Sequence, residues 1–168
     1  MRALVTGGAI RLGREIALYL AQQGYDVAVH YAGSEAGAHE TVARIKAMGL
    51  NSVALQADLL SDVGSRPLIA RAGEALGGQL TLLVNNASIF EHDTIDTATR
   101  SSWDRHMESN LRAPFVLTQE FAKQAPKAQA DAKGEPVAQG LVVNMLDQRV
   151  RKLTPDFMSY TLAKMGLW

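Results

Sequence analysis

The sequence contains no cysteine among its 168 residues, which excludes a disulfide framework and a metal site built on thiolates. Its 17 basic and 17 acidic side chains cancel, so no excess charge of one sign favours nucleic acid or an anionic membrane as a partner. Long apolar runs are also missing, which excludes a segment that crosses a bilayer. No targeting segment precedes the first apolar run, RALVTG, and we therefore expect a cytoplasmic protein.

What the sequence does contain is an alternation of short apolar runs with segments of helical periodicity. Five such runs predict buried strands, and a helical segment lies between each strand and the next. Because the runs are apolar throughout, the pattern is typical of a parallel sheet with helices on both faces. The sequence therefore predicts one α/β domain over residues 1–168, with a doubly wound parallel sheet.

The expected elements have definite places in the chain. We expect strands over residues 2–7, 25–31, 51–58, 80–88 and 141–146. We expect helices over residues 13–23, 35–48, 61–76, 101–124 and from 159 onward. Gly64 and Pro67 predict a delayed or broken start for the third helix. Residues 125–140, rich in glycine, proline and charge, predict a surface loop.

Small, polar or glycine residues follow all five predicted strands. They are found at Thr6–Gly13, His30–Ser34, Asp58, Asn85–Ser88 and Asn144–Asp147. In an open parallel sheet, ligands bind beyond the carboxyl ends of the strands. Polar residues after every strand therefore predict a ligand that lies across this edge of the sheet.

The stretch TGGAIRLG, residues 6–13, has the composition of a phosphate-binding turn. Gly7, Gly8 and Gly13 would allow the backbone to approach a pyrophosphate, and the following helix would offer free N–H groups and partial positive charge to it. A tight strand-to-helix turn without a ligand would use the same glycines, so the turn alone leaves both interpretations open.

The end of the second strand, HYAGS, bears on the choice of nucleotide. An acid near this point usually holds the ribose hydroxyls of the unphosphorylated dinucleotide, and none occurs before Glu35. His30, Tyr31 and Ser34 can instead donate hydrogen bonds to a 2′-phosphate. The sequence therefore favours NADPH over NADH, although His30 taken alone is better explained as a partly buried histidine at a strand end.

Tyr160 and Lys164 are four residues apart, on one face of the last predicted helix. A phenol loses its proton near pH ~10, and an ammonium group beside it favours the phenolate. Such a phenol can protonate an atom that becomes electron-rich when a hydride arrives. The position of the pair, soon after the fifth polar strand end, favours this chemistry over an ordinary surface pair.

Together these pieces resemble the short-chain dehydrogenases/reductases, whose fold is of the Rossmann type. The matching motifs are TGGAIRLG at 6–13, AD at 57–58, NNAS at 85–88, Asn110 within NLRAP, and YTLAK at 160–164. They occur in the family's order and extend over the whole chain. Family members continue beyond the equivalent of Trp168 with further strands, so we expect this chain to be incomplete at its C-terminus.

The resemblance implies roles for particular residues. Asn110, Tyr160 and Lys164 would be the catalytic asparagine, tyrosine and lysine, accompanied here by Asp147. The implied cofactor-binding residues are Gly7, Arg11, Leu12, Gly13, His30, Tyr31, Ser34, Asp58, Leu59, Asn85, Ala87, Ser88, Tyr160 and Lys164. The four histidines, which are His30, His39, His92 and His106, lack ligand-like spacing, so we predict no metal site.

Two departures from the usual family pattern point to a subgroup. Asp147 stands where most members have serine, and Arg11 stands where most have glycine. The pteridine reductases and the related dihydromonapterin reductases show both changes, and the former also have an aromatic residue soon after NNAS, as Phe90 is here. Gly33, where those reductases tend to have a basic residue, weakens the NADPH assignment without reversing it.

The subgroup resemblance implies a flat pterin-type substrate held by Arg11, Ser88, Phe90, Asp147 and Tyr160. Arg11 would place a cation beside the pyrophosphate and reach the pterin, and Phe90 would stack on the heterocycle. Asp147 would orient Tyr160 and help to relay a proton to a ring nitrogen, which suits reduction of a C=N bond.

Plainer interpretations of these residues stay open. Phe90 is equally compatible with a core aromatic position, and Arg11 with a solvated surface position. Asp147 can cap the following segment or pair with Arg149 or Arg151.

Three functions remain after this comparison of motifs. The first is an NADPH-dependent reductase of pterins. The second is a reductase of the same family that acts on a carbonyl, such as an oxoacyl thioester or a sugar ketone. The third is a non-catalytic NADP(H)-binding sensor. Because the family's dimer and tetramer surface includes helix 101–124 and the last helix, the resemblance implies a homo-oligomer if the chain is complete.

Overall fold

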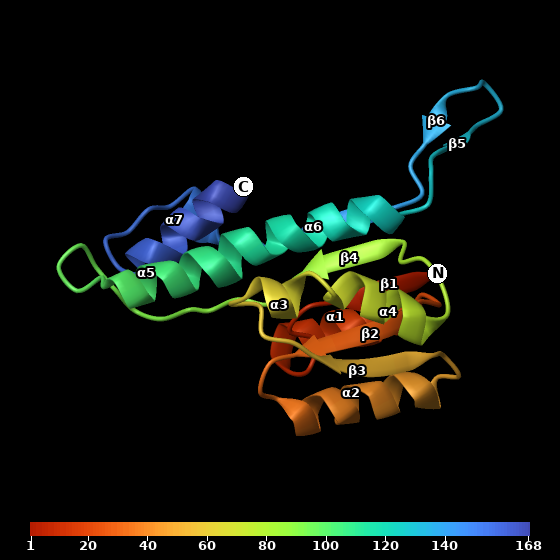
Figure 1. Cartoon of the computed structure of the whole chain (residues 1–168), viewed down its shortest axis with the longest axis horizontal. Helices are drawn as coiled ribbons and strands as arrows, with labels where there is room; N and C mark the ends of the chain where they lie inside the picture. Colours follow the sequence, from red (N-terminus) through yellow and green to blue (C-terminus); the bar gives the residue numbers. More distant parts are fainter.

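The computed structural model describes all residues from Met1 to Trp168. Five strands form one parallel sheet in the order β3-β2-β1-β4-β7. The strands are β1 (Arg2–Val5), β2 (Asp26–Tyr31), β3 (Ser52–Gln56), β4 (Leu82–Asn85) and β7 (Leu141–Asn144). The chain runs outward from β1 to β3 and then crosses back to β4, so the strand order reverses between β1 and β4 (Figure 1).

Seven α-helices connect and cover these strands. They are α1 (Arg11–Gln22), α2 (Glu35–Ala47), α3 (Asp62–Ser65), α4 (Leu68–Leu76), α5 (Arg100–Met107), α6 (Ala113–Gln124) and α7 (Met158–Leu167). The break between α3 and α4 falls at Pro67, as the sequence predicts. All of the helices are too short or too polar to serve as a membrane span.

Successive side chains of the central strands enter two hydrophobic cores, one on each face of the sheet. Val5 and Val29 point into a core of 14 buried residues that α1 and α2 complete. Leu4 and Ala28, one position away in each strand, point into a second core of 14 residues that α4 and α6 complete. The predicted doubly wound parallel sheet with helices on both faces is therefore confirmed.

The predicted helix over 101–124 forms one continuous rod, labelled α5 and α6 in Figure 1. A π-helical turn, η1 (Glu108–Arg112), joins α5 to α6. Pro114 lies at the start of α6 and has no N–H to give to the carbonyl of Asn110, four residues earlier. A π turn of this kind often occurs at functional sites, and here it contains the fully buried Asn110.

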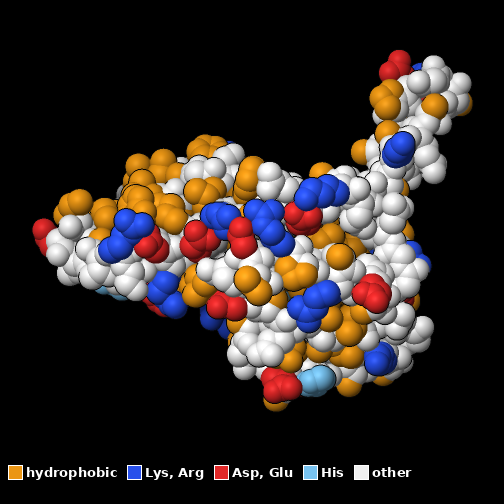
Figure 2. Space-filling view, in the orientation of Figure 1, with side chains coloured by type: hydrophobic (Ala, Val, Ile, Leu, Met, Phe, Trp, Pro, Cys, Tyr) orange, Lys and Arg blue, Asp and Glu red, His pale blue; other side chains and the backbone are white.

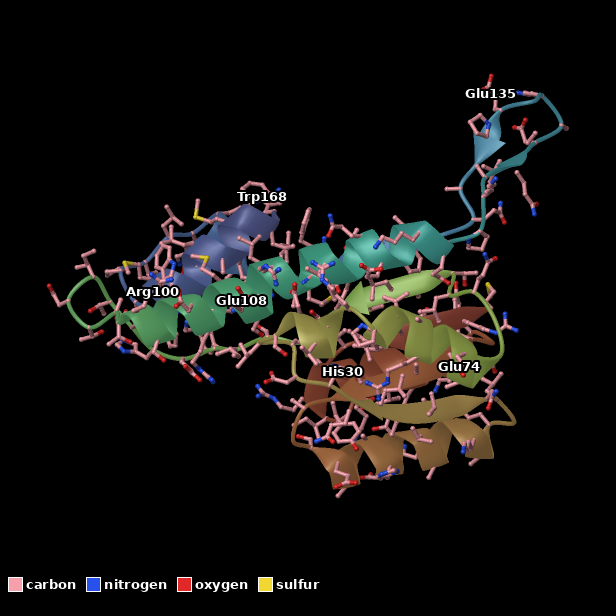
Figure 3. All side chains as sticks on the ribbon, viewed as in Figure 1. His30, Glu74, Arg100, Glu108, Glu135 and Trp168 are labelled. Carbon is pink, nitrogen blue, oxygen red and sulfur yellow. The ribbon has the colours of Figure 1, made fainter.

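The predicted surface loop over 125–140 contains a short hairpin. Two antiparallel strands, β5 (Gln129–Ala130) and β6 (Pro136–Val137), are closed by a turn in which Asp131 Oδ1 accepts the N–H groups of Lys133 and Glu135. The hairpin stands away from the body of the molecule, with Glu135 near its tip (Figures 1 and 3). Its strands are polar and two residues long, so no apolar alternation marks them in the sequence.

Candidate active site

A cavity of about 580 Å³ lies at the carboxyl edge of the sheet. The predicted residues that line it are Gly7, Arg11, Leu12, Gly13, His30, Tyr31, Ser34, Ala87, Ser88, Phe90, Asp147, Tyr160 and Lys164. The other lining residues are Ala9, Ile10, Ala32, Gly33, Asn86, Met145 and Leu146, and all of them fall within the predicted polar stretches at the strand ends. Most of this second group are small or apolar, so their residue types alone assign them no chemical role.

Four predicted site residues lie outside this lining. The exposed Asp58 folds back, and its Oδ1 accepts the backbone N–H of Leu60 at 2.9 Å. Leu59 is buried in the core that α4 and α6 complete. Asn85 is buried and donates through Nδ2 to Asn144 Oδ1 at 2.8 Å, which joins the ends of β4 and β7. Asn110 lies behind the cavity wall and contacts the chain segment that forms it.

The turn after β1 is packed so closely that it requires glycine. A Cβ added to Gly13 would lie 2.1 Å from the backbone oxygen of Gly7 and 2.5 Å from Asn86 Nδ2. Gly7 itself has a φ of +62°, in the left-handed region that glycine enters without strain. No side chain caps the start of α1, so its first N–H groups are free to bind an anion at the cavity.

Arg11 is the unusual residue of this turn. Its φ is +53°, and a residue other than glycine loses about 1–2 kcal/mol in that conformation. Its side chain is exposed, lines the cavity and forms no ion pair within the chain. Backbone strain at a ligand cavity marks Arg11 as a functional candidate rather than an ordinary surface residue.

His30 fixes the turn and has no hydrogen-bond donor left for a phosphate. Its Nδ1 accepts the N–H of Gly7 at 3.1 Å, and its Nε2 donates to the carbonyl of Ala57 at 3.1 Å. The side chain is only 2% exposed, and burial lowers its pKa to about 4, so it is neutral. The expectation that His30 donates directly to a 2′-phosphate is therefore corrected, and Tyr31 and Ser34 remain the candidate donors at this point.

Tyr160 and Asp147 meet at the other end of the cavity, as the sequence predicts. The Tyr160 hydroxyl donates to Asp147 Oδ2 at 3.0 Å. The second oxygen, Oδ1, accepts the backbone N–H of Arg149 at 2.9 Å and begins the short 3₁₀ turn η2 (Gln148–Val150). Both interpretations of Asp147 are thus present at once, because its two carboxylate oxygens have separate partners.

The acidity of the phenol differs from the sequence-based expectation. Burial, followed by the hydrogen bond and charge of Asp147, raises the pKa of Tyr160 to about 12, although Ser88 and Arg149 act in the opposite direction. Lys164 Nζ donates to the carbonyl of Met145 at 2.8 Å and lies 5.8 Å from the centre of the Tyr160 ring. Burial lowers the pKa of Lys164. In this arrangement the phenol keeps its proton, because burial and the Asp147 carboxylate both favour the protonated form.

Asn110 supports the cavity wall from behind. Its Oδ1 accepts the N–H of Ile89 at 2.9 Å and the hydroxyl of Ser88 at 3.2 Å, and its Nδ2 donates to the Ile89 carbonyl at 2.8 Å. These three bonds hold the segment after β4 against the π turn. No hydrogen bond joins Asn110 to Tyr160 or Lys164 within the chain, so its contribution here is to position Ser88.

Asp93 holds the start of α7, and sequence reasoning missed it. Its Oδ1 accepts the N–H of Ser159 at 3.0 Å, its Oδ2 accepts the Ser102 hydroxyl at 3.2 Å, and its backbone oxygen accepts the N–H of Met158 at 3.2 Å. Burial raises the pKa of Asp93, but these hydrogen bonds outweigh burial and leave the pKa lowered. Because this cap comes from 66 residues away, no local motif could reveal it.

Phe90 is a cavity residue and not part of either core. It is 53% exposed, and its ring lies 4.7 Å from that of Tyr160 in an edge-on arrangement. Phe157 stacks on one of its faces, with the ring centres 4.1 Å apart and the planes 6° from parallel. Phe157 has a φ of +58°, so this stack also involves a strained residue.

Comparisons with known proteins agree with this architecture. The short chain dehydrogenase family model matches residues 1–168. The 3-oxoacyl-[acyl-carrier-protein] reductase FabG of Staphylococcus epidermidis is 36% identical over 165 residues, which are 98% of this chain and 64% of that protein. Its counterpart from Staphylococcus aureus is 37% identical over 130 residues, which are 77% of this chain and 52% of that protein.

Solved structures show the same fold. FolM alternative dihydrofolate reductase 1 from Brucella canis, complexed with NADP, is 41% identical with a TM-score of 0.88, over 99% of this chain and 64% of that one. A short chain dehydrogenase from Burkholderia cenocepacia, also in complex with NADP, is 34% identical with a TM-score of 0.89, over 99% and 63%. This chain thus spans less than two thirds of the length of these relatives. It belongs to the short-chain dehydrogenase/reductase family.

Proposed function

We propose that the protein is an NADPH-dependent reductase of a flat pterin-type substrate, with Tyr160 and Asp147 as its proton donor system. The observation that carries this proposal is the 3.0 Å hydrogen bond between the Tyr160 hydroxyl and Asp147 Oδ2 at the cavity. A carboxylate can accept hydrogen bonds from the amino and ring N–H groups of a pterin. A carbonyl group is itself only an acceptor, so it has no hydrogen to donate to a carboxylate. The acid at this position therefore suits a nitrogen heterocycle.

The residues of the turn after β1 fit NADPH. The close approach of Gly13 to Gly7 and the uncapped start of α1 provide a place for the pyrophosphate. After β2, Tyr31 and Ser34 line the cavity, and no acidic residue occurs between the end of this strand and Glu35. The absence of an acid here favours a nucleotide that carries a 2′-phosphate. The similar structures from Brucella canis and Burkholderia cenocepacia contain NADP. When bound, this cofactor supplies the hydride.

The side chains around the cavity supply and direct the proton. Since the pKa of Tyr160 is about 12, its hydroxyl carries a proton at neutral pH and can give it to a substrate nitrogen. Lys164 Nζ, 5.8 Å from the centre of the Tyr160 ring, places positive charge beside the phenolate that remains. Phe157 covers only one face of the Phe90 ring, and about half of the Phe90 side chain is exposed, so Phe90 can stack on a flat heterocycle.

Reduction of a carbonyl is the second candidate function. The observation that favours it is the 36% identity to a 3-oxoacyl-[acyl-carrier-protein] reductase over 98% of this chain. NADPH oxidation with dihydropterin and dihydrofolate, measured against an oxoacyl thioester and a sugar ketone, separates the two. We expect turnover of the pterins. A clear preference for the carbonyl panel would contradict the pterin proposal.

Two variants connect the activity to the observed hydrogen bond. Tyr160→Phe removes the proton donor, so we expect kcat to fall by about 10²–10⁴ while NADPH binding, followed by fluorescence, is retained. Asp147→Ser replaces the carboxylate with a hydroxyl, which can still hydrogen-bond a carbonyl substrate but no longer offers the acceptors that a pterin requires. We therefore expect it to impair pterin turnover far more than any residual carbonyl turnover. NADPH binding without turnover of any substrate would instead indicate a non-catalytic binding module.

We also propose that the protein forms a homo-oligomer through its long helices. Apolar side chains gather over α7 in Figure 2, where Trp168 is 63% exposed, and α6 contributes the exposed Phe115 (58%). Apolar surface of this kind on helices is typical of a protein interface. Light scattering after size-exclusion chromatography tests this proposal, and a monomer at micromolar concentration would contradict it.

A further inference from the structure

Arg149 is held beside the proposed proton donor by the same carboxylate that binds the phenol. Asp147 Oδ1 accepts the backbone N–H of Arg149, and Oδ2 accepts the hydroxyl of Tyr160. The Arg149 guanidinium lies 4.8 Å from the ring centre of Phe157 and 6.0 Å from that of Phe90. Arg149 does not itself line the cavity, but its guanidinium lies next to Phe90, which does, and its charge acts on the Tyr160 hydroxyl.

No carboxylate neutralises this guanidinium. Its two hydrogen bonds go from Nη1 to the Thr154 hydroxyl and, at 3.4 Å, to the carbonyl oxygen of Asp156. The Asp156 carboxylate contacts His92 at 3.2 Å instead. Five other arginines each pair with a carboxylate, namely Arg14, Arg66, Arg100, Arg105 and Arg112.

The unused edge of Arg149 has the shape that a carboxylate requires. Neither Nε nor Nη2 has a hydrogen-bond partner in the chain, and these two nitrogens together can bind a carboxylate through two parallel bonds. The guanidinium lies against the stacked rings of Phe90 and Phe157, and the Arg149 side chain is only partly exposed. A charged bond at this place is therefore less screened than one in open solvent.

We propose that Arg149 is a specificity-determining residue that receives a carboxylate carried by the substrate on a flexible side chain. The flat ring occupies the cavity beside Phe90 and Tyr160, and its tail crosses the Phe90–Phe157 pair to reach the guanidinium. This inference rests on the proposed function and narrows its substrate class to flat nitrogen heterocycles with an anionic tail.

The test compares two substrates that share a dihydropterin ring. Dihydrofolate ends in a glutamate with free carboxylates, whereas dihydrobiopterin has a neutral tail. For Arg149→Gln we expect kcat/KM in NADPH oxidation to fall about tenfold with dihydrofolate and by less than about twofold with dihydrobiopterin. Arg149→Lys should retain part of the preference for dihydrofolate, and added salt should weaken that preference in the unaltered protein.

Arg151→Gln is the matched control. Arg151 follows on the same turn, but its guanidinium lies 5.6 Å from the Trp168 ring, and we expect this variant to leave both substrates unaffected. An equal loss of both substrates in Arg149→Gln would overturn the inference, because a residue that only supports Phe157 affects both alike. If the unaltered protein reduces neither substrate, the proposed function fails. Calorimetric binding of the same two compounds then decides the inference, and equal affinities in Arg149→Gln and the unaltered protein would overturn it.

Discussion

The two ends of the cavity are built in different ways. At the end near α1, backbone groups in close contact form the wall, and the buried His30 connects the turn to the neighbouring strand. At the end near α7, individual side chains such as Asp147 and Phe90 form the wall on partly exposed turns. The first end is therefore fixed by steric contacts and admits few substitutions, whereas the second end can change its chemistry by exchange of single side chains.

The largest effect on stability should come from a methyl group added to the turn at the end of the cavity near α1. Gly13→Ala places a Cβ 2.1 Å from a backbone oxygen, so we expect a loss of about 3 kcal/mol in the free energy of unfolding and loss of NADPH affinity. Gly33→Ala is the control, because Gly33 lines the same cavity with no atom within 4 Å of an added Cβ. Denaturant titration of both variants measures the difference. Equal stabilities would show that the turn is not rigid.

Low pH should destabilise the folded protein at the same end of the cavity, because His30 becomes protonated there. Its pKa is about 4 in the folded protein and 6.5 when unperturbed, so the unfolded chain binds the extra proton first. Stability is fully present above pH ~6.5 and is lost as the pH falls toward ~4, with about 2 kcal/mol lost by pH ~5. Unfolding free energies between these values, compared with those of His30→Gln, measure this contribution. In the control variant His39→Gln, at an exposed histidine, unfolding free energy should depend on pH as steeply as in the unaltered protein. An equally steep pH dependence in His30→Gln would show that His30 is not the group responsible.

A smaller effect is expected where side chains support the second end. Asp93→Ala removes the cap of α7, and we expect a loss of about 1–2 kcal/mol in stability together with a lower kcat, since Tyr160 lies in the first turns of that helix. Asp96→Ala, an exposed acid nearby without such bonds, serves as the control. Asp93→Ala should lower kcat more than Asp96→Ala does. Equal kcat values in the two variants would show that the position of Tyr160 does not depend on this cap.

The smallest effect concerns the strain at Arg11. Arg11→Gly relieves the left-handed conformation but adds freedom to the unfolded chain, so we expect a net gain of only about 0.5 kcal/mol in stability. The same variant removes a cation from the cavity, so NADPH should bind more weakly. Thermal unfolding should therefore show a small rise in stability, while NADPH titration should show a lower affinity. A variant that loses stability would show that Arg11 is held by favourable contacts.

The sequence predicts those features that depend on neighbours along the chain. The strand runs, the break at Pro67 and the four-residue spacing of Tyr160 and Lys164 are local, and the structure has each of them. The meeting of Asp147 with Tyr160 was also predictable, because both lie near the carboxyl end of one strand and the helix that follows.

Features that depend on distant partners were not predictable in the same way. The neutral state of His30 depends on its burial and on the carbonyl of Ala57, and the raised pKa of Tyr160 depends on how deeply α7 packs. The cap that Asp93 provides comes from another part of the chain. In each case the residue type was visible in the sequence, but its charge state or role arises only when separate elements meet.

The hairpin of β5 and β6 has a practical consequence for work on this protein. It projects from the body between the end of α6 and the start of β7, and the register of β7 against β4 begins only at Leu141 (Figure 1). Lengthening a loop of this kind adds little closure entropy, and its tip makes no contact with either core. The tip near Glu135 is therefore a suitable position for inserting an affinity tag or a fluorescent label without disturbing the cavity at the carboxyl edge of the sheet.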